Sequence, residues 1–127
     1  MAMSERQALD MWRQTVCASV RADSPDLTAR QQAILMTISL TRGPHTVRGL
    51  AETLELAKPA ITRALDTLER HELVKRVRDH KDLRNVFLER TPEGARMLRS
   101  LAVMIIDAET GSPVSNRETD SDNSQVA

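Results

Sequence analysis

The sequence contains few of the residues that stabilise small disulfide-rich or aromatic-rich domains. Its 127 residues include one cysteine, four glycines, one tryptophan, one phenylalanine and no tyrosine. The single cysteine, Cys17, excludes an internal disulfide bond. Because Trp12 and Phe87 are the only aromatic residues, we expect a core of Leu, Ile, Val, Ala and Met, which suits packed helices with short strands.

Long apolar runs are also absent. No segment approaches the length of about 20 apolar residues that crosses a bilayer. The first ten residues, MAMSERQALD, are polar and charged, and no apolar stretch typical of a signal peptide follows them. We therefore expect a soluble cytoplasmic protein with room for one compact domain.

The two signs of charge balance over the whole chain but not within its parts. Residues 1–41 carry four Lys and Arg against four Asp and Glu, residues 42–96 carry twelve against nine, and residues 97–127 carry two against five. DNA phosphates require local positive potential, not a basic total. An excess of three is equally typical of a solvated surface, so charge alone indicates no partner.

Apolar spacing predicts four helices in the first part of the chain. The first covers residues 4–21, where apolar residues recur three or four positions apart, at Leu9, Trp12, Val16 and Val20. Thr28 is placed to cap a second helix that runs to about residue 41 and stops at Gly43-Pro44. Two further helices are expected over Val47–Leu54 and Pro59–His71.

From Leu73 onward the pattern changes to extended structure. Leu73–Val77 and Val86–Arg90 are predicted strands, joined by a charged loop over residues 78–85. A last helix is expected from Pro92, capped by Thr91, to about residue 108. The acidic run over 109–127 is predicted to be disordered. The predicted fold class is mostly α with a small β-hairpin.

Residues 47–68 have the pattern of a helix-turn-helix. Ala51 is small where the two helices would cross, and apolar residues stand at the inner corners, namely Leu50, Leu54, Leu56, Ile61 and Leu65. The second helix would expose Lys58, Pro59, Thr62, Arg63 and Asp66 near its N-terminus, where recognition helices present base-reading side chains. An ordinary pair of helices with a solvated surface is the alternative. The basic hairpin that follows favours a winged helix-turn-helix.

In this order and spacing, residues 27–105 resemble the DNA-binding core of the MarR family of bacterial transcription regulators. The motifs are Leu50-Ala51, Lys58-Pro59-Ala60-Ile61-Thr62-Arg63, Leu68-Glu69, Leu73-Val74, Asp79-x-x-Asp82-x-Arg84 and Thr91-Pro92-Glu93-Gly94. The resemblance implies that Lys58, Pro59, Thr62 and Arg63 face the major groove. It also implies that Arg84 reaches the minor groove and that Asp82 orients Arg84 or Arg63 through a salt bridge.

The resemblance also carries an expectation about assembly and function. It implies a homodimeric, sequence-specific repressor at a pseudo-palindromic operator in the bacterial nucleoid, with a core over about 27–94 and dimerisation helices over about 4–21 and 94–108. The apolar residues of the first helix, with Leu98, Leu101 and Ile105, would form the interface. A small phenolic or lipophilic effector is a further expected partner. The alternative is a winged helix that binds proteins and no longer reads DNA.

Three features depart from the family pattern. Glu55 stands at the turn where glycine is usual, so a left-handed conformation there would cost about 1 kcal/mol. Ala57 replaces a common serine cap at the start of the second helix, which would cost about 1 kcal/mol. The first helix is short for a dimerisation arm and the chain after Asp107 is predicted to be unstructured, so we expect a smaller interface than is usual in the family.

No catalytic or cofactor site is indicated. Cys17 lies where some relatives sense peroxides, but those sensors usually have nearby tyrosines, so we interpret it as a buried structural thiol. The histidines His45, His71 and His80 lack metal-ligand spacing. Neither a glycine-rich phosphate loop nor a catalytic set of side chains stands out. We therefore expect neither an enzyme, a cofactor nor a metal.

Overall fold

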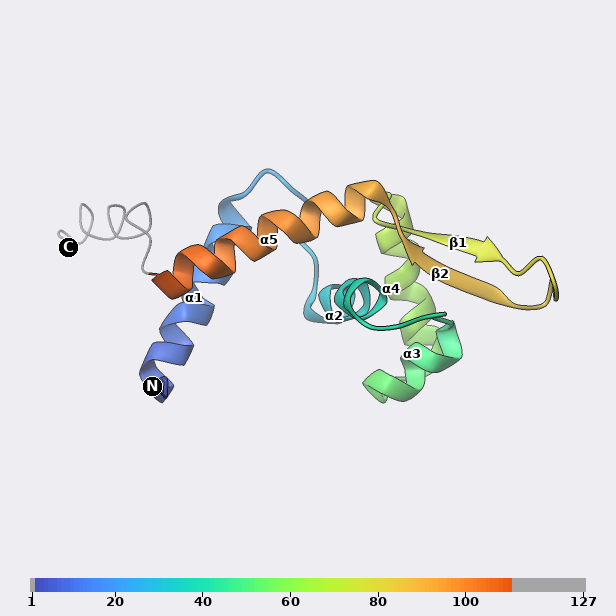
Figure 1. The fold of residues 1–127 in the computed structure, drawn as a ribbon, viewed down its shortest axis with the longest axis horizontal. Coiled ribbons are helices and arrows are strands. Elements are labelled where there is room, and N and C mark those ends of the chain that lie inside the picture. Colours follow the sequence, from blue (N-terminus) through green and yellow to red (C-terminus); the bar gives the residue numbers. More distant parts are fainter. Residues whose placement is uncertain (1, 111–127) are drawn as a thin grey trace. The chain divides into compact units, whose positions relative to one another are not determined.

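The computed structural model describes residues 2–110, which form five helices and a two-stranded antiparallel sheet (Figure 1). Their order is α1 (Glu5–Arg21), α2 (Ala29–Leu40), α3 (Val47–Leu54), α4 (Lys58–Arg70), β1 (Val74–Arg78), β2 (Val86–Arg90) and α5 (Pro92–Thr110). The predicted fold class, a mostly helical winged helix-turn-helix, is confirmed. The chain divides into two compact units: residues 27–98, and the residues before 27 together with those from 99 onward.

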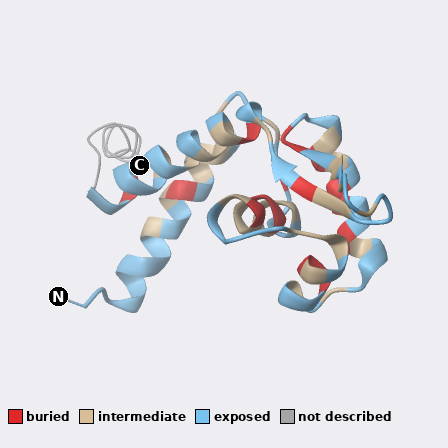
Figure 2. Ribbon diagram, turned by 45° about the vertical axis from the view of Figure 1, so that its right-hand side comes forward, coloured by how far each residue is buried: buried red, intermediate tan, exposed pale blue. Residues whose placement is uncertain are grey.

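The core of the 27–98 unit lies where α2, α3, α4 and the hairpin pack together. Figure 2 shows its buried positions on these elements. The largest fully buried side chains are all aliphatic: Ile34, Leu35, Leu50, Ile61, Leu65, Leu68 and Leu73. Met97 and Leu98, in the first turns of α5, pack against this cluster. The aliphatic core expected from composition is therefore present.

Side-chain caps set the starts of the helices. Thr28 caps α2 as predicted: its hydroxyl accepts a hydrogen bond from the Gln31 amide at 3.2 Å, and the Gln31 side chain accepts one from the Thr28 amide at 2.9 Å. The Thr91 hydroxyl accepts a hydrogen bond from the Gly94 amide at 3.0 Å at the start of α5. Both caps satisfy amides that a helix leaves unpaired at its first turn.

Several element boundaries differ from the sequence prediction by one residue. Helix α4 covers Lys58–Arg70, not Pro59–His71, and β1 covers Val74–Arg78, not Leu73–Val77. The reason is that Leu73 closes the end of α4, where its amide donates to the Leu68 carbonyl at 2.9 Å. The preceding residue, Glu72, has a left-handed backbone with φ 62°. Sequence periodicity does not report such a closing bond.

The start of α1 and the end of α5 also differ from the sequence prediction. Helix α1 starts at Glu5, and Ser4, expected inside the helix, is its N-cap. Helix α5 continues to Thr110, so the prediction of disorder is wrong for residues 109 and 110. The rest of the predicted acidic tail, residues 111–127, lies outside the described residues.

Backbone hydrogen bonds join the hairpin to the segment before α3 and to the residue before α5. Val74 pairs with Arg90, and the Leu88 amide donates to the His45 carbonyl at 2.9 Å, which adds a one-residue bridge. The Thr91 amide donates to the Leu73 carbonyl at 3.1 Å. A Cβ at Gly94 would lie 2.3 Å from the Leu73 carbonyl oxygen, so this close approach requires glycine.

The second unit, described for residues 2–26 and 99–110, buries little. Thr15 and Ala108 are its buried residues. Large apolar side chains are exposed on α1 and on the last turns of α5, namely Leu9, Trp12, Val16, Val20, Val103, Ile105 and Ile106. Cys17 is partly exposed, so the prediction of a buried thiol is wrong. None of the described helices has the length and apolarity that a membrane span needs.

Candidate nucleic-acid interface

Helices α3 and α4 form the helix-turn-helix that the sequence predicts. Leu50 and Ala51 of α3 and Ile61 and Leu65 of α4 are buried, as the inner corners of the motif require. Glu55 closes α3 in a left-handed conformation, with φ 56° and ψ 48°. The prediction of a non-glycine residue in this conformation is confirmed, and its expected cost is about 1 kcal/mol.

Helix α4 starts without a side-chain cap. Ala57 occupies the N-cap position with an extended backbone, φ −69° and ψ 147°, and makes no capping hydrogen bond. Pro59 lies in the first turn, where its missing amide hydrogen leaves no further donor unpaired. The Ala60 and Ile61 amides both donate to the Ala57 carbonyl, at 3.0 and 3.2 Å, so few amides at this end are left for a side-chain cap.

The outer face of α4 carries the four side chains expected to meet the major groove. Lys58, Pro59, Thr62 and Arg63 are all exposed in the first two turns. Within residues 2–110, no carboxylate lies at ion-pair distance from Lys58 or Arg63. This face therefore presents two cationic side chains and a hydroxyl to an incoming acceptor.

Asp66 is exposed on α4, as expected, and it also contacts the hairpin. Arg76 of β1 contacts Asp66 at 3.3 Å and forms a second, short ion pair with Glu69. These contacts join the recognition helix α4 to the wing. Sequence analysis missed Arg76, although two acidic residues three positions apart on one helix face, followed by a basic strand, are a usable signal for such a clamp.

The wing places Arg84 in a defined orientation. The Arg84 Nε and Nη2 atoms each donate to the Asp82 carboxylate at 3.0 Å, and the Arg84 amide donates to the same carboxylate at 3.1 Å. The sequence left open whether Asp82 pairs with Arg84 or Arg63, and in the structure it pairs with Arg84. These hydrogen bonds lower the pKa of Asp82 and raise the pKa of Arg84.

Further hydrogen bonds hold the loop that carries Arg84. Arg78 Nη1 donates to the Leu83 carbonyl at 2.5 Å. The Asp79 carboxylate accepts from the Lys81 amide at 2.9 Å and from the Asn85 side chain at 3.3 Å. The loop is therefore ordered by its own polar groups, and the Arg84 side chain keeps 89% of its surface exposed.

The histidines do not form a metal centre. His45 contacts the Thr41 carbonyl through Nε2 at 3.1 Å, His71 ends α4, and His80 lies in the wing loop. In the part of the chain that the structure describes, no three His, Cys, Asp or Glu side chains come together in a way that could hold an ion.

Comparison with known proteins shows what this geometry is similar to. A sequence profile described as the MarR family matches residues 27–86. A mutant of MepR from S. aureus, bound to an oligodeoxyribonucleotide, has a TM-score of 0.70 at 18% identity and covers 94% of this chain and 88% of its own. YusO from Bacillus subtilis has a TM-score of 0.69 at 20% identity, covering 96% and 91%.

A third solved structure has a similar fold. A mutant of ZitR from Lactococcus lactis has a TM-score of 0.58 at 24% identity, covering 98% of this chain and 92% of that one. Curated protein sequences give no match. At these identities the solved structures show a shared fold. Within this fold, residues 27–86, which include the helix-turn-helix and the wing loop, match the MarR family profile.

Proposed function

We propose that this protein is a sequence-specific DNA-binding transcription regulator that inserts α4 into the major groove and the wing into the minor groove. One observation carries the proposal. The 27–98 unit presents an exposed basic face on α4 together with the wing residue Arg84, whose guanidinium already donates two hydrogen bonds to Asp82. Such pre-orientation reduces the entropy lost when a long side chain binds.

Each candidate residue has a role that fits its chemistry. Arg63 has a planar fork that can donate to guanine O6 and N7, so we assign it base recognition. Lys58, Pro59 and Thr62 contact base edges and phosphates beside it. Arg84 senses minor-groove width and nearby phosphate, and Asp82 positions it.

We also propose that the regulator works as a homodimer. The exposed apolar side chains of α1 and the end of α5, among them Leu9, Trp12 and Ile106, form more apolar surface than a small monomer usually exposes. A two-fold dimer would present two copies of α4 about one helical turn apart. The operator is then pseudo-palindromic with a footprint on the order of 20 base pairs, and bound protein acts as a repressor.

Family resemblance supports two finer points. We propose that the protein acts in the bacterial cytoplasm, at the nucleoid, and that a small phenolic or lipophilic effector modulates DNA binding. One relative of the same fold, MepR from S. aureus, has been solved with ethidium bromide. Release of a bound operator duplex on addition of such compounds, followed by fluorescence anisotropy, tests the effector.

The decisive experiment selects bound fragments from genomic DNA and compares variants on the selected operator and a scrambled duplex. Arg63→Ala should cost roughly 1–3 kcal/mol per half-site and lose discrimination between the two. Arg84→Ala should weaken binding to both duplexes alike and lower the slope of log affinity against log salt by about one unit per lost contact. If both variants bind as wild type does, the DNA-reading proposal is wrong and the alternative, a protein-binding winged helix, replaces it.

A further inference from the structure

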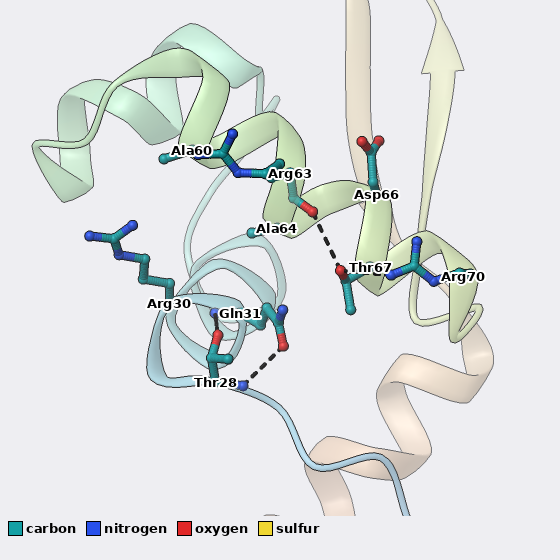
Figure 3. A pocket seen from close by; sticks show the side chains of 9 residues that line it. All are labelled: Thr28, Arg30, Gln31, Ala60, Arg63, Ala64, Asp66, Thr67 and Arg70. Atoms are coloured by element: carbon teal, nitrogen blue, oxygen red, sulfur yellow. Dashed lines mark hydrogen bonds between the residues drawn. The ribbon is translucent and has the colours of Figure 1, made fainter.

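A groove lies between the start of α2 and the outer side of α4 (Figure 3). Its volume is about 410 Å³, and its charged lining consists of three arginines and one carboxylate. The arginines are Arg30 on α2 and Arg63 and Arg70 on α4, and the carboxylate is Asp66. Only Arg63 is part of the DNA-binding face described above, so Arg30 and Arg70 remain without an assigned role.

Cationic side chains outnumber carboxylates in the lining of the groove. Asp66 is already paired with Arg76 of β1, which does not line the groove. Among residues 2–110, no carboxylate lies at ion-pair distance from Arg30, Arg63 or Arg70. Three guanidinium groups thus line a space with one carboxylate, and Arg76 contacts that carboxylate from outside while it also pairs with Glu69.

The uncharged polar groups of the lining are engaged within the protein. Thr28 and Gln31 bond each other in the cap of α2, as Figure 3 shows. The Thr67 hydroxyl donates to the Arg63 carbonyl at 3.5 Å and accepts from Arg70 Nη2 at 3.0 Å. What the groove offers to a ligand is therefore mainly cationic donors, and a fitting ligand must carry negative charge on acceptor oxygens.

We propose that this groove binds the phosphodiester backbone of the same duplex whose bases α4 reads. This inference rests on the proposed function. Arg63 lines the groove and also belongs to the exposed face of α4, so the groove is continuous with that face. Phosphates border the major groove, and cationic contacts to them position a protein without reading sequence. Arg30 and Arg70 are such positioning contacts.

Salt-dependent fluorescence anisotropy on the operator and the scrambled duplex tests the proposal. The double variant Arg30→Ala/Arg70→Ala should lower the slope of log affinity against log salt by about two units per half-site on both duplexes, and affinity near 0.2 M salt by roughly tenfold per half-site. Discrimination between the duplexes should persist, in contrast to Arg63→Ala. The double lysine variant, which keeps both charges, should retain most of the slope.

Arg96→Ala provides the matched control, because Arg96 is an exposed arginine of α5 that pairs with Glu93 and does not line the groove. If the double variant binds like this control while Arg63→Ala and Arg84→Ala lose binding, the groove proposal is overturned and the proposed function stands. If none of these variants changes DNA binding, the proposed function itself fails.

A second measurement separates DNA phosphate from a free anion. Inorganic phosphate at constant ionic strength should leave the melting temperature of wild type and double variant equally unaffected at millimolar concentration. If phosphate stabilises wild type but not the double variant, and the DNA salt slope is the same in both, the groove binds a free anion and the backbone proposal is wrong. Equal melting temperatures of the two proteins without phosphate exclude a folding defect.

Discussion

The two units of this chain use apolar side chains in opposite ways. In residues 27–98, large aliphatic side chains such as Leu35 and Leu65 are completely buried. In the other unit, Leu9 is 69% exposed, Trp12 is 58% exposed, and Thr15 and Ala108 are the buried residues among those described. The first unit therefore contains the core that stabilises it, whereas the second exposes apolar surface, which the proposed dimer would cover.

Removal of a core side chain from the winged unit should have the largest effect. Leu65→Ala removes a side chain with no solvent exposure and should lower the free energy of unfolding by about 2–5 kcal/mol. Leu40→Ala is the matched control in the same unit, because Leu40 is 74% exposed and should change stability by less than about 0.5 kcal/mol. Urea denaturation followed by circular dichroism measures both. Equal losses of stability in the two variants would contradict the assignment of Leu65 to the stabilising core.

Truncation of the exposed tryptophan should act on assembly. Trp12→Ala removes the largest exposed apolar side chain of α1 and should weaken the proposed dimer by about 2 kcal/mol, roughly thirtyfold in Kd. Arg6→Ala, on the same helix but outside the apolar stripe, should leave dimerisation unchanged. Sedimentation equilibrium at micromolar concentration measures the dissociation constant. A wild-type protein that remains a 14.2 kDa monomer would show that this surface has another partner.

Relief of backbone strain at Glu55 should change the free energy of unfolding less than removal of a core side chain does, and in the opposite direction. Glu55→Gly should raise the free energy of unfolding by about 1 kcal/mol, since glycine adopts the left-handed conformation at φ 56° without a Cβ clash. The same substitution at Glu52, inside α3, should lower stability by about 1 kcal/mol. Thermal unfolding of both variants checks the pair. A loss of stability in Glu55→Gly would mean that the Glu55 side chain itself stabilises the turn.

The wing should show the smallest effect, confined to acidic solution. The pKa of Asp82 is below its ordinary value of 3.8 because Arg84 donates to the charged carboxylate. The ion pair between Asp82 and Arg84 is therefore fully formed above pH 3.8 and is lost only as the pH falls through the lowered pKa of Asp82. The Arg84 Nε–H resonance should report this loss in an NMR titration. Asp82→Asn should abolish the transition, and persistence of the transition would assign it to another group.

Local signals predicted most of the winged unit. Thr28 and Thr91 were identified as caps because a capping side chain bonds to amides two or three residues away. The strained Glu55 and the uncapped Ala57 followed from their places in the helix-turn-helix pattern. The exposed face of Lys58, Thr62 and Arg63 followed from helical periodicity, which fixes which residues share a face.

The structure was needed wherever partners are distant in sequence. Asp66 faces solvent as expected, but the sequence did not reveal that Arg76, ten residues later on β1, pairs with it. The shift of β1 by one residue depends on how Leu73 closes α4 and on the close approach of Gly94. No local pattern contains these contacts, because the backbone path between the two partners decides their distance.

By itself, then, the amino-acid sequence determined the order of elements, the helix caps and the candidate DNA-reading face, because these depend on short-range spacing. Tertiary packing alone decided that Arg76 joins α4 to the wing and that Arg30 lies across a groove from Arg63. It also decided that Trp12 remains exposed while Leu65 is buried. The physical reason is that burial and ion pairing depend on which surfaces the folded chain brings together, and apolar spacing is the same for a helix that faces its own core and for one that faces a partner.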